Sequence, residues 1–277
     1  MPTIGETLQQ ATARLQGVSG TPRQDAQTIL GHVMGDKPRE VLIAHPEYPV
    51  SDSELHVFEK LLTLRKHGMP LAYIVGQRAF YDRTFRINPQ VLIPRPETEH
   101  VVEAALDWVG RFGARRIIDV GTGSGVIALT LAAKLPNTGV IAADVSSAAL
   151  LVAVENVNGL TNVVLVQSDL LTPFRGPFDV ICANLPYIAT GEMNILEVAH
   201  FEPHIALDGG SDGLVLIRRL LEQAPARLAV PGLLLIEHGA DQGLAVEALA
   251  KAAFPHAAVN IIKDYAGLDR VVRVEQI

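Results

Sequence analysis

The sequence has few of the residues that mark several large classes of protein. Its 277 residues include one cysteine, Cys182, and one tryptophan, and aromatic residues make up only 5% of the chain. A single cysteine excludes an internal disulfide and a cysteine-based zinc site, and it is typical of a reducing compartment. No apolar run approaches the roughly 18–20 residues of a transmembrane helix, and the first residues lack the pattern of a signal peptide. We therefore expect a soluble, cytoplasmic protein without a metal site.

Basic residues are also in the minority, and the formal net charge is −7 at pH 7. Broad, non-specific binding of nucleic acid needs many lysines and arginines on one face, so we expect no direct nucleic-acid partner. The acidic surplus lies beyond residue 95, whereas the first 95 residues are slightly basic. A docking surface for an RNA-associated partner is therefore expected in the first part of the chain.

Helix signals dominate residues 1–75. Thr3 with Glu6, and Ser51 with Glu54, have the spacing of a capping box, and each pair precedes an amphipathic run. The chain is long enough for one large domain and one small one, since 48% of its residues are hydrophobic. We predict a small helical domain over 1–75, which serves either in partner recognition or as a structural cap.

The pattern changes over residues 76–96. Short apolar stretches at 80–81, 85–87 and 91–93 predict strands or a hairpin. The proline-rich stretch that follows predicts a stiff turn into a helix that begins at Glu97 and ends near Val109. We interpret 76–96 as a β-hairpin linker that either reaches over the pocket of the next domain or acts as a rigid hinge.

Strand and helix patterns alternate over residues 97–277. Buried strands are predicted at 116–120, 139–143, 163–167, 178–183 and 233–237, with helices at 126–134, 147–156, 213–228 and 241–253. This alternation is typical of a mostly parallel α/β sheet covered on both faces. Two last strands, at 258–262 and 270–274, are joined by a turn around Gly267 and predict an antiparallel hairpin at the end of the sheet.

A glycine-rich stretch leads from the first of these strands into a helix. It comprises Gly121, Thr122, Gly123, Ser124 and Gly125. Glycine permits a tight turn there and lets backbone N–H groups approach a ligand at the start of the helix. Val126 occupies the position where a dinucleotide fingerprint has its last glycine, so a pyrophosphate-binding loop is not predicted.

Polar residues follow the next strands. Asp144 ends the second strand and is placed to accept hydrogen bonds from ribose hydroxyls, while Asp169, followed by Leu170, ends the third and is placed to take an adenine amine. Each acid is alternatively a cap or a turn residue. A nucleoside ligand without phosphates explains the glycines and both acids, and S-adenosylmethionine is the usual one.

The stretch after the fourth strand is Asn184, Leu185, Pro186 and Tyr187. Pro186 forces Leu185 into an extended conformation, and open α/β sheets bind their ligands at the carboxyl ends of their strands. The Asn184 side-chain oxygen and the Leu185 carbonyl then form two acceptors beside an aromatic ring, which suits a planar group bearing an NH2. A turn in which the asparagine satisfies only local backbone is the simpler alternative.

These residues resemble the class I methyltransferases that act on planar NH2 groups, whose motif is usually Asn-Pro-Pro-Tyr. The match to the HemK/PrmC group, the peptide chain release factor N5-glutamine methyltransferases, covers nearly the whole chain. It rests on the helical start, Gly76 with Phe80 and Tyr81, Ile-Pro-Arg-Pro-Glu-Thr-Glu at 93–99, Phe-Glu-Pro at 201–203 and Glu-His-Gly at 237–239. Leu185 departs from the family, which usually has proline there.

The resemblance implies a class I S-adenosylmethionine-dependent methyltransferase, with a Rossmann-like, seven-stranded, mostly parallel sheet preceded by a small helical bundle. It implies a methyltransferase domain over 97–277 and a helical domain that recognises release factors, and we expect a monomer. The cofactor would be held by residues 121–125, Asp144, Asp169, Leu170 and Asn184. The catalytic turn would be residues 184–187, and Phe80 and Tyr187 would wall the substrate slot.

Two other functions remain open. An RNA or DNA adenine-N6 methyltransferase is the first, although the ribosomal RNA adenine dimethyltransferases usually place their helical domain after the methyltransferase domain and are typically basic. The second is a binding protein that keeps the cofactor but has lost catalysis through Leu185.

Overall fold

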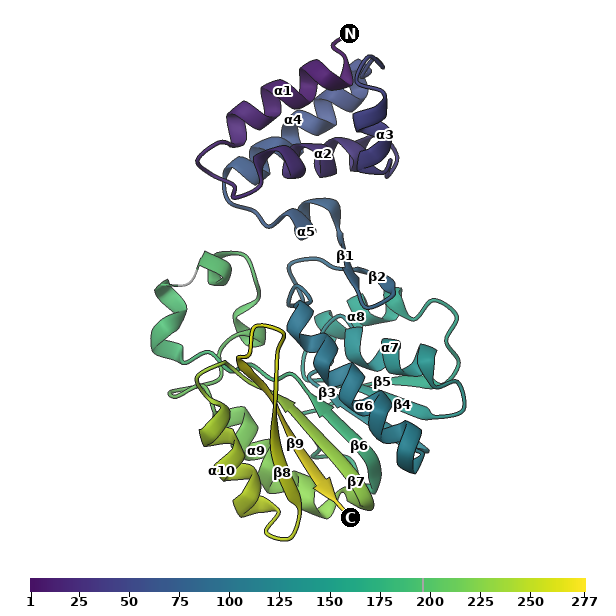
Figure 1. Ribbon diagram of the computed structural model, residues 1–277, viewed down its shortest axis with the longest axis vertical. Helices are drawn as coiled ribbons and strands as arrows, with labels where there is room; N and C mark the ends of the chain where they lie inside the picture. The colour runs from purple at the N-terminus through teal and green to yellow at the C-terminus, as the bar shows by residue number, and fades with distance from the viewer. Residues whose placement is uncertain (196) are drawn as a thin grey trace. The chain divides into compact units, whose positions relative to one another are not determined.

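The computed structural model describes residues 1–195 and 197–277, and the chain divides into two compact units, Met1–Gln77 and Arg78–Ile277. Figure 1 shows the elements of both units.

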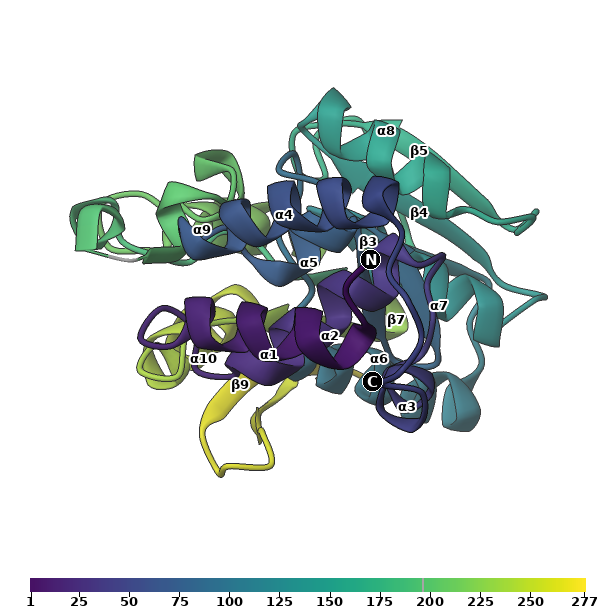
Figure 2. The same cartoon turned by 90° about the horizontal axis from the view of Figure 1, so that it is seen from above.

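The first unit is a bundle of helices. They are α1 (Ile4–Leu15), α2 (Pro22–Val33), α3 (Arg39–Ala44), α4 (Asp52–Lys66) and the short α5 (Leu71–Val75). Both capping boxes predicted from the sequence are confirmed, because Thr3 and Ser51 each exchange hydrogen bonds with the glutamate three residues later. The helices α1 and α2 pack side by side (Figure 2) and enclose a core in which Leu15, Leu30 and Phe58 are fully buried.

The second unit is built on a seven-stranded sheet in the order β5-β4-β3-β6-β7-β9-β8. Its strands are β3 (Arg116–Val120), β4 (Gly139–Asp144), β5 (Val163–Gln167), β6 (Phe178–Ala183), β7 (Leu228–Glu237), β8 (Ala258–Lys263) and β9 (Asp269–Gln276). The strands from β5 to β7 are parallel, and β9 is antiparallel to both β7 and β8. The predicted seven-stranded, mostly parallel sheet with a final antiparallel hairpin is therefore confirmed.

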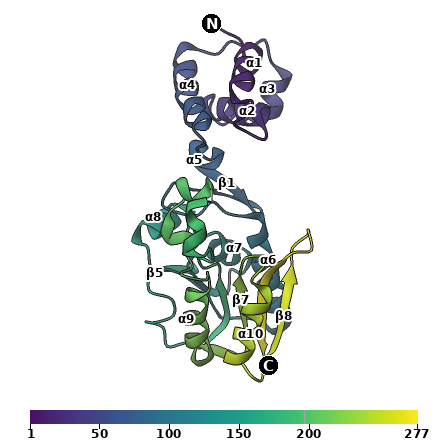
Figure 3. The ribbon, with the colours of Figure 1, turned by 90° about the vertical axis from the view of Figure 1, so that its left-hand side faces the viewer.

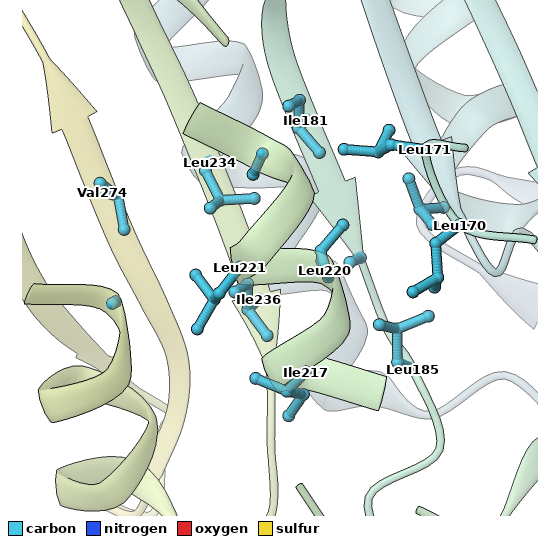
Figure 4. Close-up of a cluster of buried hydrophobic side chains, with 14 of the residues drawn as sticks. Leu170, Leu171, Ile181, Leu185, Ile217, Leu220, Leu221, Leu234, Ile236 and Val274 are labelled. Carbon is cyan, nitrogen blue, oxygen red and sulfur yellow. The ribbon is translucent and has the colours of Figure 1, made fainter. Parts of the chain in front are cut away.

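Alternate residues of the central strands enter two different cores. Ile117 and Cys182 face α6 (Glu99–Phe112) and α7 (Val126–Lys134), whereas Ile118 and Ile181 belong to the core beneath α9 (Val215–Gln223) and α10 (Gly243–Ala253). Figure 3 shows α9 and α10 together beside the sheet, and Figure 4 shows the buried leucines and isoleucines on the α9 side. Successive side chains of a strand point to opposite faces of the sheet. Because helices cover both faces here, nearly every residue of these strands is apolar.

A two-stranded hairpin, β1 (Gln77–Phe80) and β2 (Arg83–Arg86), precedes the sheet. The strand predicted over 91–93 is wrong, because no strand forms there. The Val91 and Ile93 side chains are buried, as the apolar pattern indicated, but the Ile93 N–H donates to the Glu202 carboxylate instead of to a neighbouring strand. A short 3-10 helix, η1 (Pro96–Thr98), then leads into α6.

The described helices include none that is both long enough and apolar enough to cross a membrane.

Asn156, the last residue of α8 (Ser147–Asn156), connects the hairpin to the glycine-rich loop. Its Nδ2 donates to the carbonyls of Arg86 and Ser124 at 2.9 and 3.0 Å, and its Oδ1 accepts from the Arg86 N–H at 2.7 Å. Asn156→Ala leaves these buried groups unpaired, so we expect it to lower the free energy of unfolding by roughly 2–3 kcal/mol. Urea denaturation followed by the fluorescence of the only tryptophan, Trp108, measures this loss.

The matched control is Asn260→Ala, because Asn260 is exposed on β8. It should change the free energy of unfolding by no more than about 0.5 kcal/mol. Equal effects of the two substitutions would show that the Asn156 hydrogen bonds contribute nothing to stability.

Candidate active site

A cavity of about 630 Å³ lies at the carboxyl ends of four adjacent parallel strands. Its lining comes from residues 121–124 after β3, 144–146 after β4, 168–170 after β5 and 184–186 after β6, with parts of 90–98 and 204–219. This is the edge of the sheet at which α/β proteins bind ligands. The structure therefore brings the predicted glycine-rich loop, both acids and Asn184 to one cavity.

The glycine-rich loop has a backbone that requires its glycines. Gly121, Gly123 and Gly125 have φ angles of 76°, 56° and 86°, in the left-handed region that side chains disfavour. A Cβ at Gly121 would also lie 3.0 Å from Leu185 Cδ2, so the loop packs directly against the turn after β6.

Asp119, at the end of β3, holds this loop to the start of α7. Its Oδ2 accepts from Thr122 Oγ1 at 2.6 Å and from the Ala128 N–H at 3.2 Å. The carboxyl is fully buried, and this burial raises its pKa to about 7 against the opposing effect of the two hydrogen bonds. Asp119 is not among the residues that the sequence predicts for the site.

Asp144 lines the cavity with both oxygens already oriented. Its Oδ2 accepts from the Gly123 N–H and its Oδ1 from the Ser146 N–H, each at 2.8 Å. A carboxylate has about four lone-pair positions, so each oxygen retains one for a ligand. Burial raises the pKa of Asp144. Two such acceptors on one rigid carboxylate suit the adjacent hydroxyls of a ribose.

Asp169 also lines the cavity, but its Oδ2 is paired with Nη2 of Arg219 on α9 at 2.6 Å. Both side chains are about half exposed. Leu170 has a φ of 50°, which turns the chain sharply at this strand end. The predicted adenine acceptor therefore has an arginine partner that the sequence did not indicate.

Asn184 follows directly after β6 and donates from Nδ2 to Thr98 Oγ1 at 3.1 Å. Leu185 is buried, and Figure 4 shows its side chain in the α9-side cluster near Leu170 and Ile217. In the part of the chain that the structure describes, neither Asn184 Oδ1 nor the Leu185 carbonyl accepts a hydrogen bond. Two acceptors on this turn are thus left for a ligand.

The loop 208–213 packs closely against the turn 184–187. A Cβ on Gly209 would lie 2.7 Å from the Pro186 carbonyl oxygen, and one on Gly213 would lie 2.2 Å from that of Tyr187. The Tyr187 carbonyl also accepts from Gln242 Nε2 at 2.8 Å. Glycine is needed here because two backbones approach closely.

Two residues predicted for the substrate slot do not line the cavity. Phe80 is buried against Phe85, with ring centroids 6.1 Å apart. Tyr187 is half-buried, and burial, assisted by the charge of Glu237, raises the pKa of its phenol to about 12. The Tyr187 hydroxyl therefore stays protonated at neutral pH.

Buried carboxyls complete the surroundings of the site. Glu202 binds Arg95 Nη2 at 2.5 Å and the Ile93 N–H at 3.2 Å, which joins the 201–203 loop to the 93–95 segment. Glu237 ends β7, and burial raises its pKa to about 7. Glu237 and Thr98 are not among the residues that the sequence predicts for the site, although both lie in motifs that carry the family resemblance.

Comparisons with known proteins match nearly the whole chain. The family described as PrmC N-terminal domain matches residues 6–76, and the one described as Methyltransferase small domain matches residues 105–201. A release factor glutamine methyltransferase of Moorella thermoacetica is 42% identical over 97% of this chain and 96% of its own. One of Neisseria gonorrhoeae is 42% identical over 92% and 94%. A methyltransferase structure from Pyrococcus furiosus, 20% identical, covers 72% of this chain and 92% of its own with a TM-score of 0.52, which shows the shared fold.

Gly209→Ala tests the close packing of the loop 208–213 against the turn 184–187. The added Cβ must displace the Pro186 or Gly213 carbonyl, and such overpacking should lower the free energy of unfolding by about 2 kcal/mol in urea denaturation. Gly191→Ala is the control, since nothing lies within 4 Å of a Cβ there. If both variants were as stable as the wild type, the loop would not be packed against the turn.

The raised pKa of Asp119 predicts that the stability of the protein depends on pH. Because its pKa is about 7 when folded and 3.8 in an unfolded chain, the folded state holds more protons between these values, and stability falls as pH rises. From pH 5 to 7 the wild type should lose roughly 2–3 kcal/mol relative to Asp119→Asn, which cannot ionise. Urea titrations of both proteins across this range measure the difference, and a constant difference would contradict the raised pKa.

Proposed function

Because the chain belongs to the release factor glutamine methyltransferase family, we propose that it transfers a methyl group from S-adenosylmethionine to the side-chain amide nitrogen of a release factor glutamine. We propose the glutamine of the Gly-Gly-Gln motif as the target. The observation that carries this proposal is the turn after β6, where Asn184 Oδ1 and the Leu185 carbonyl remain as acceptors at the edge of the cavity.

The residues present fit the cofactor. Asp144 offers two oriented acceptors for a ribose, and the loop 121–125 allows a ligand to approach the backbone at the start of α7. Asp169 retains Oδ1 for an adenine amine while Oδ2 binds Arg219. When bound, S-adenosylmethionine supplies a methyl group that its sulfonium already activates.

The task of the protein is then to orient a weak nucleophile. An amide nitrogen reacts poorly because its lone pair is delocalised into the carbonyl. We assign the two N–H groups of the substrate amide to Asn184 Oδ1 and the Leu185 carbonyl, which fixes the position of the nitrogen and favours positive charge on it during transfer. The buried side chain of Leu185 and the restraint from Pro186 support a fixed carbonyl at this position.

We also propose the partner, the location and the oligomeric state of the protein. The release factor is the protein partner, the helical unit is proposed as its recognition domain, and the enzyme is proposed to act as a cytoplasmic monomer without direct contact to nucleic acid. The acidic net charge of −7 supports the last point.

The experiment that tests the function is methyl transfer from labelled S-adenosylmethionine to a purified release factor. A release factor with Gln→Ala in its Gly-Gly-Gln loop is the control, and naked ribosomal RNA is offered as a competing substrate. Label should appear on the release factor and vanish with the control. Label on RNA would indicate an adenine methyltransferase, and label on neither would indicate a binding protein without catalysis.

Asn184→Ala is expected to lower kcat by about 100-fold or more, because one of two acceptors for the substrate amide is removed. The affinity for S-adenosylmethionine, measured by calorimetry, should change by no more than about 3-fold, which corresponds to less than 1 kcal/mol. The exposed Asn260→Ala variant serves as the control. Equal losses of turnover and cofactor affinity would refute the assignment of Asn184 to the substrate.

A further inference from the structure

Three polar side chains from distant parts of the chain lie together beside the cavity, and two of them are buried. Thr98 ends η1, Asn184 follows β6 and Glu237 ends β7. In the parallel pairing of β6 with β7, Ala183 is opposite Ile236, so the next residues, Asn184 and Glu237, leave the sheet side by side. Thr98 and Glu237 are each only 2% exposed. The mechanism above does not use either residue.

One hydrogen bond and one unpaired acceptor define a direction among these side chains. Asn184 Nδ2 donates to Thr98 Oγ1 at 3.1 Å, and among the described residues the buried Glu237 Oε2 has no hydrogen-bond partner. The Thr98 and Asn184 side chains lie close enough to Glu237 to lower its pKa against the effect of burial. A hydroxyl has a single proton. When Thr98 gives this proton to Glu237, its oxygen can only accept from Asn184.

This direction decides which end of the Asn184 amide is offered to a ligand. If the amide were rotated by half a turn, its oxygen would face the lone pairs of Thr98 Oγ1 and the negative charge of Glu237, and the NH2 group would lose its hydrogen bond to Thr98. Resting on the proposed function, we propose that Thr98 and Glu237 are positioning residues that hold the Asn184 amide with Oδ1 toward the NH2 group of the substrate glutamine.

The charge of Glu237 enforces the direction. An ionised carboxylate can only accept hydrogen bonds. A protonated one can donate to Thr98, and Thr98 could then donate its own proton to Asn184. Glu97 on η1, Tyr187 after β6 and Arg270 on β9 face Glu237, and the pKa of Glu237, raised chiefly by burial, is about 7. The rate of methyl transfer should therefore fall as pH falls through about 7.

Thr98→Val and Thr98→Ser are a matched pair of substitutions. They test the proposed relay, by which we mean the hydrogen bonds from Asn184 to Thr98 and from Thr98 to Glu237. Valine removes the hydroxyl at nearly constant volume, and serine keeps it. We expect Thr98→Val to lower kcat by at least about 10-fold, with KM for the release factor and Kd for S-adenosylmethionine within about 3-fold of wild type. Thr98→Ser should restore most of kcat. Equal activity of Thr98→Val and wild type, or equal loss in Thr98→Ser and Thr98→Val, would overturn the proposal.

Glu237→Gln supplies a readout that a merely structural role would not change. Glutamine carries both a donor and an acceptor, so it no longer imposes a direction, and it does not titrate. This variant should have a lower kcat at pH 8 and should lack the decline in rate below pH 7 that the wild type shows. An unchanged decline in the variant would assign it to another group and contradict the role of Glu237.

Side-chain NMR separates this proposal from the proposed function. The Asn184 NH2 resonances, identified by their loss in Asn184→Ala, should exchange slowly with solvent in the wild type and faster in Thr98→Val. Equal exchange in both proteins would refute the relay whether or not a release factor is methylated. Absence of methyl transfer by the wild type would instead refute the function, and the exchange rates would still decide the relay.

Discussion

A partly buried side-chain amide must satisfy its NH2 group, and leaving such a group unpaired costs roughly 1–3 kcal/mol. Asn184 meets this requirement inside the protein, by donating to Thr98 at 3.1 Å, and its oxygen is left at the cavity. The rest of the site depends on this arrangement. The parallel register of β6 and β7 brings Glu237 beside Asn184, the loop 208–213 braces the following backbone, and the loop 121–125 closes against Leu185.

Leu185 illustrates how a departure from the usual family residue is accommodated. Its side chain is buried in the cluster beneath α9, and a Cβ on Gly121 would lie 3.0 Å from the Leu185 Cδ2 atom. The leucine therefore packs against both the core and the glycine-rich loop 121–125, while Pro186 still restrains its backbone. Packing replaces part of the rigidity that a second proline would give. The fixed position of Leu185 therefore favours retained catalysis over an inactive binding protein.

Much of the fold was predictable, because strands buried on both faces are short apolar runs with clear ends. The prediction for β3 matches at both ends, and both capping boxes form as expected. The pairings within the site were not predictable. Thr98 and Asn184 are 86 residues apart, and Asp169 and Arg219 are 50 apart, so no periodic pattern connects them. The stretch at 91–93 was misread because buried apolar residues in an irregular segment have the same composition as a strand.

Tandem mass spectrometry of a release factor, after incubation with the enzyme and S-adenosylmethionine, shows whether the glutamine side chain is the target of methyl transfer. It locates the added methyl group at the level of a single side chain. We expect one methyl group on the side-chain nitrogen of the Gly-Gly-Gln glutamine. A methyl group on a lysine, an arginine or a carboxylate would contradict the role given to the acceptor pair at Asn184 and Leu185, as would an unmodified release factor.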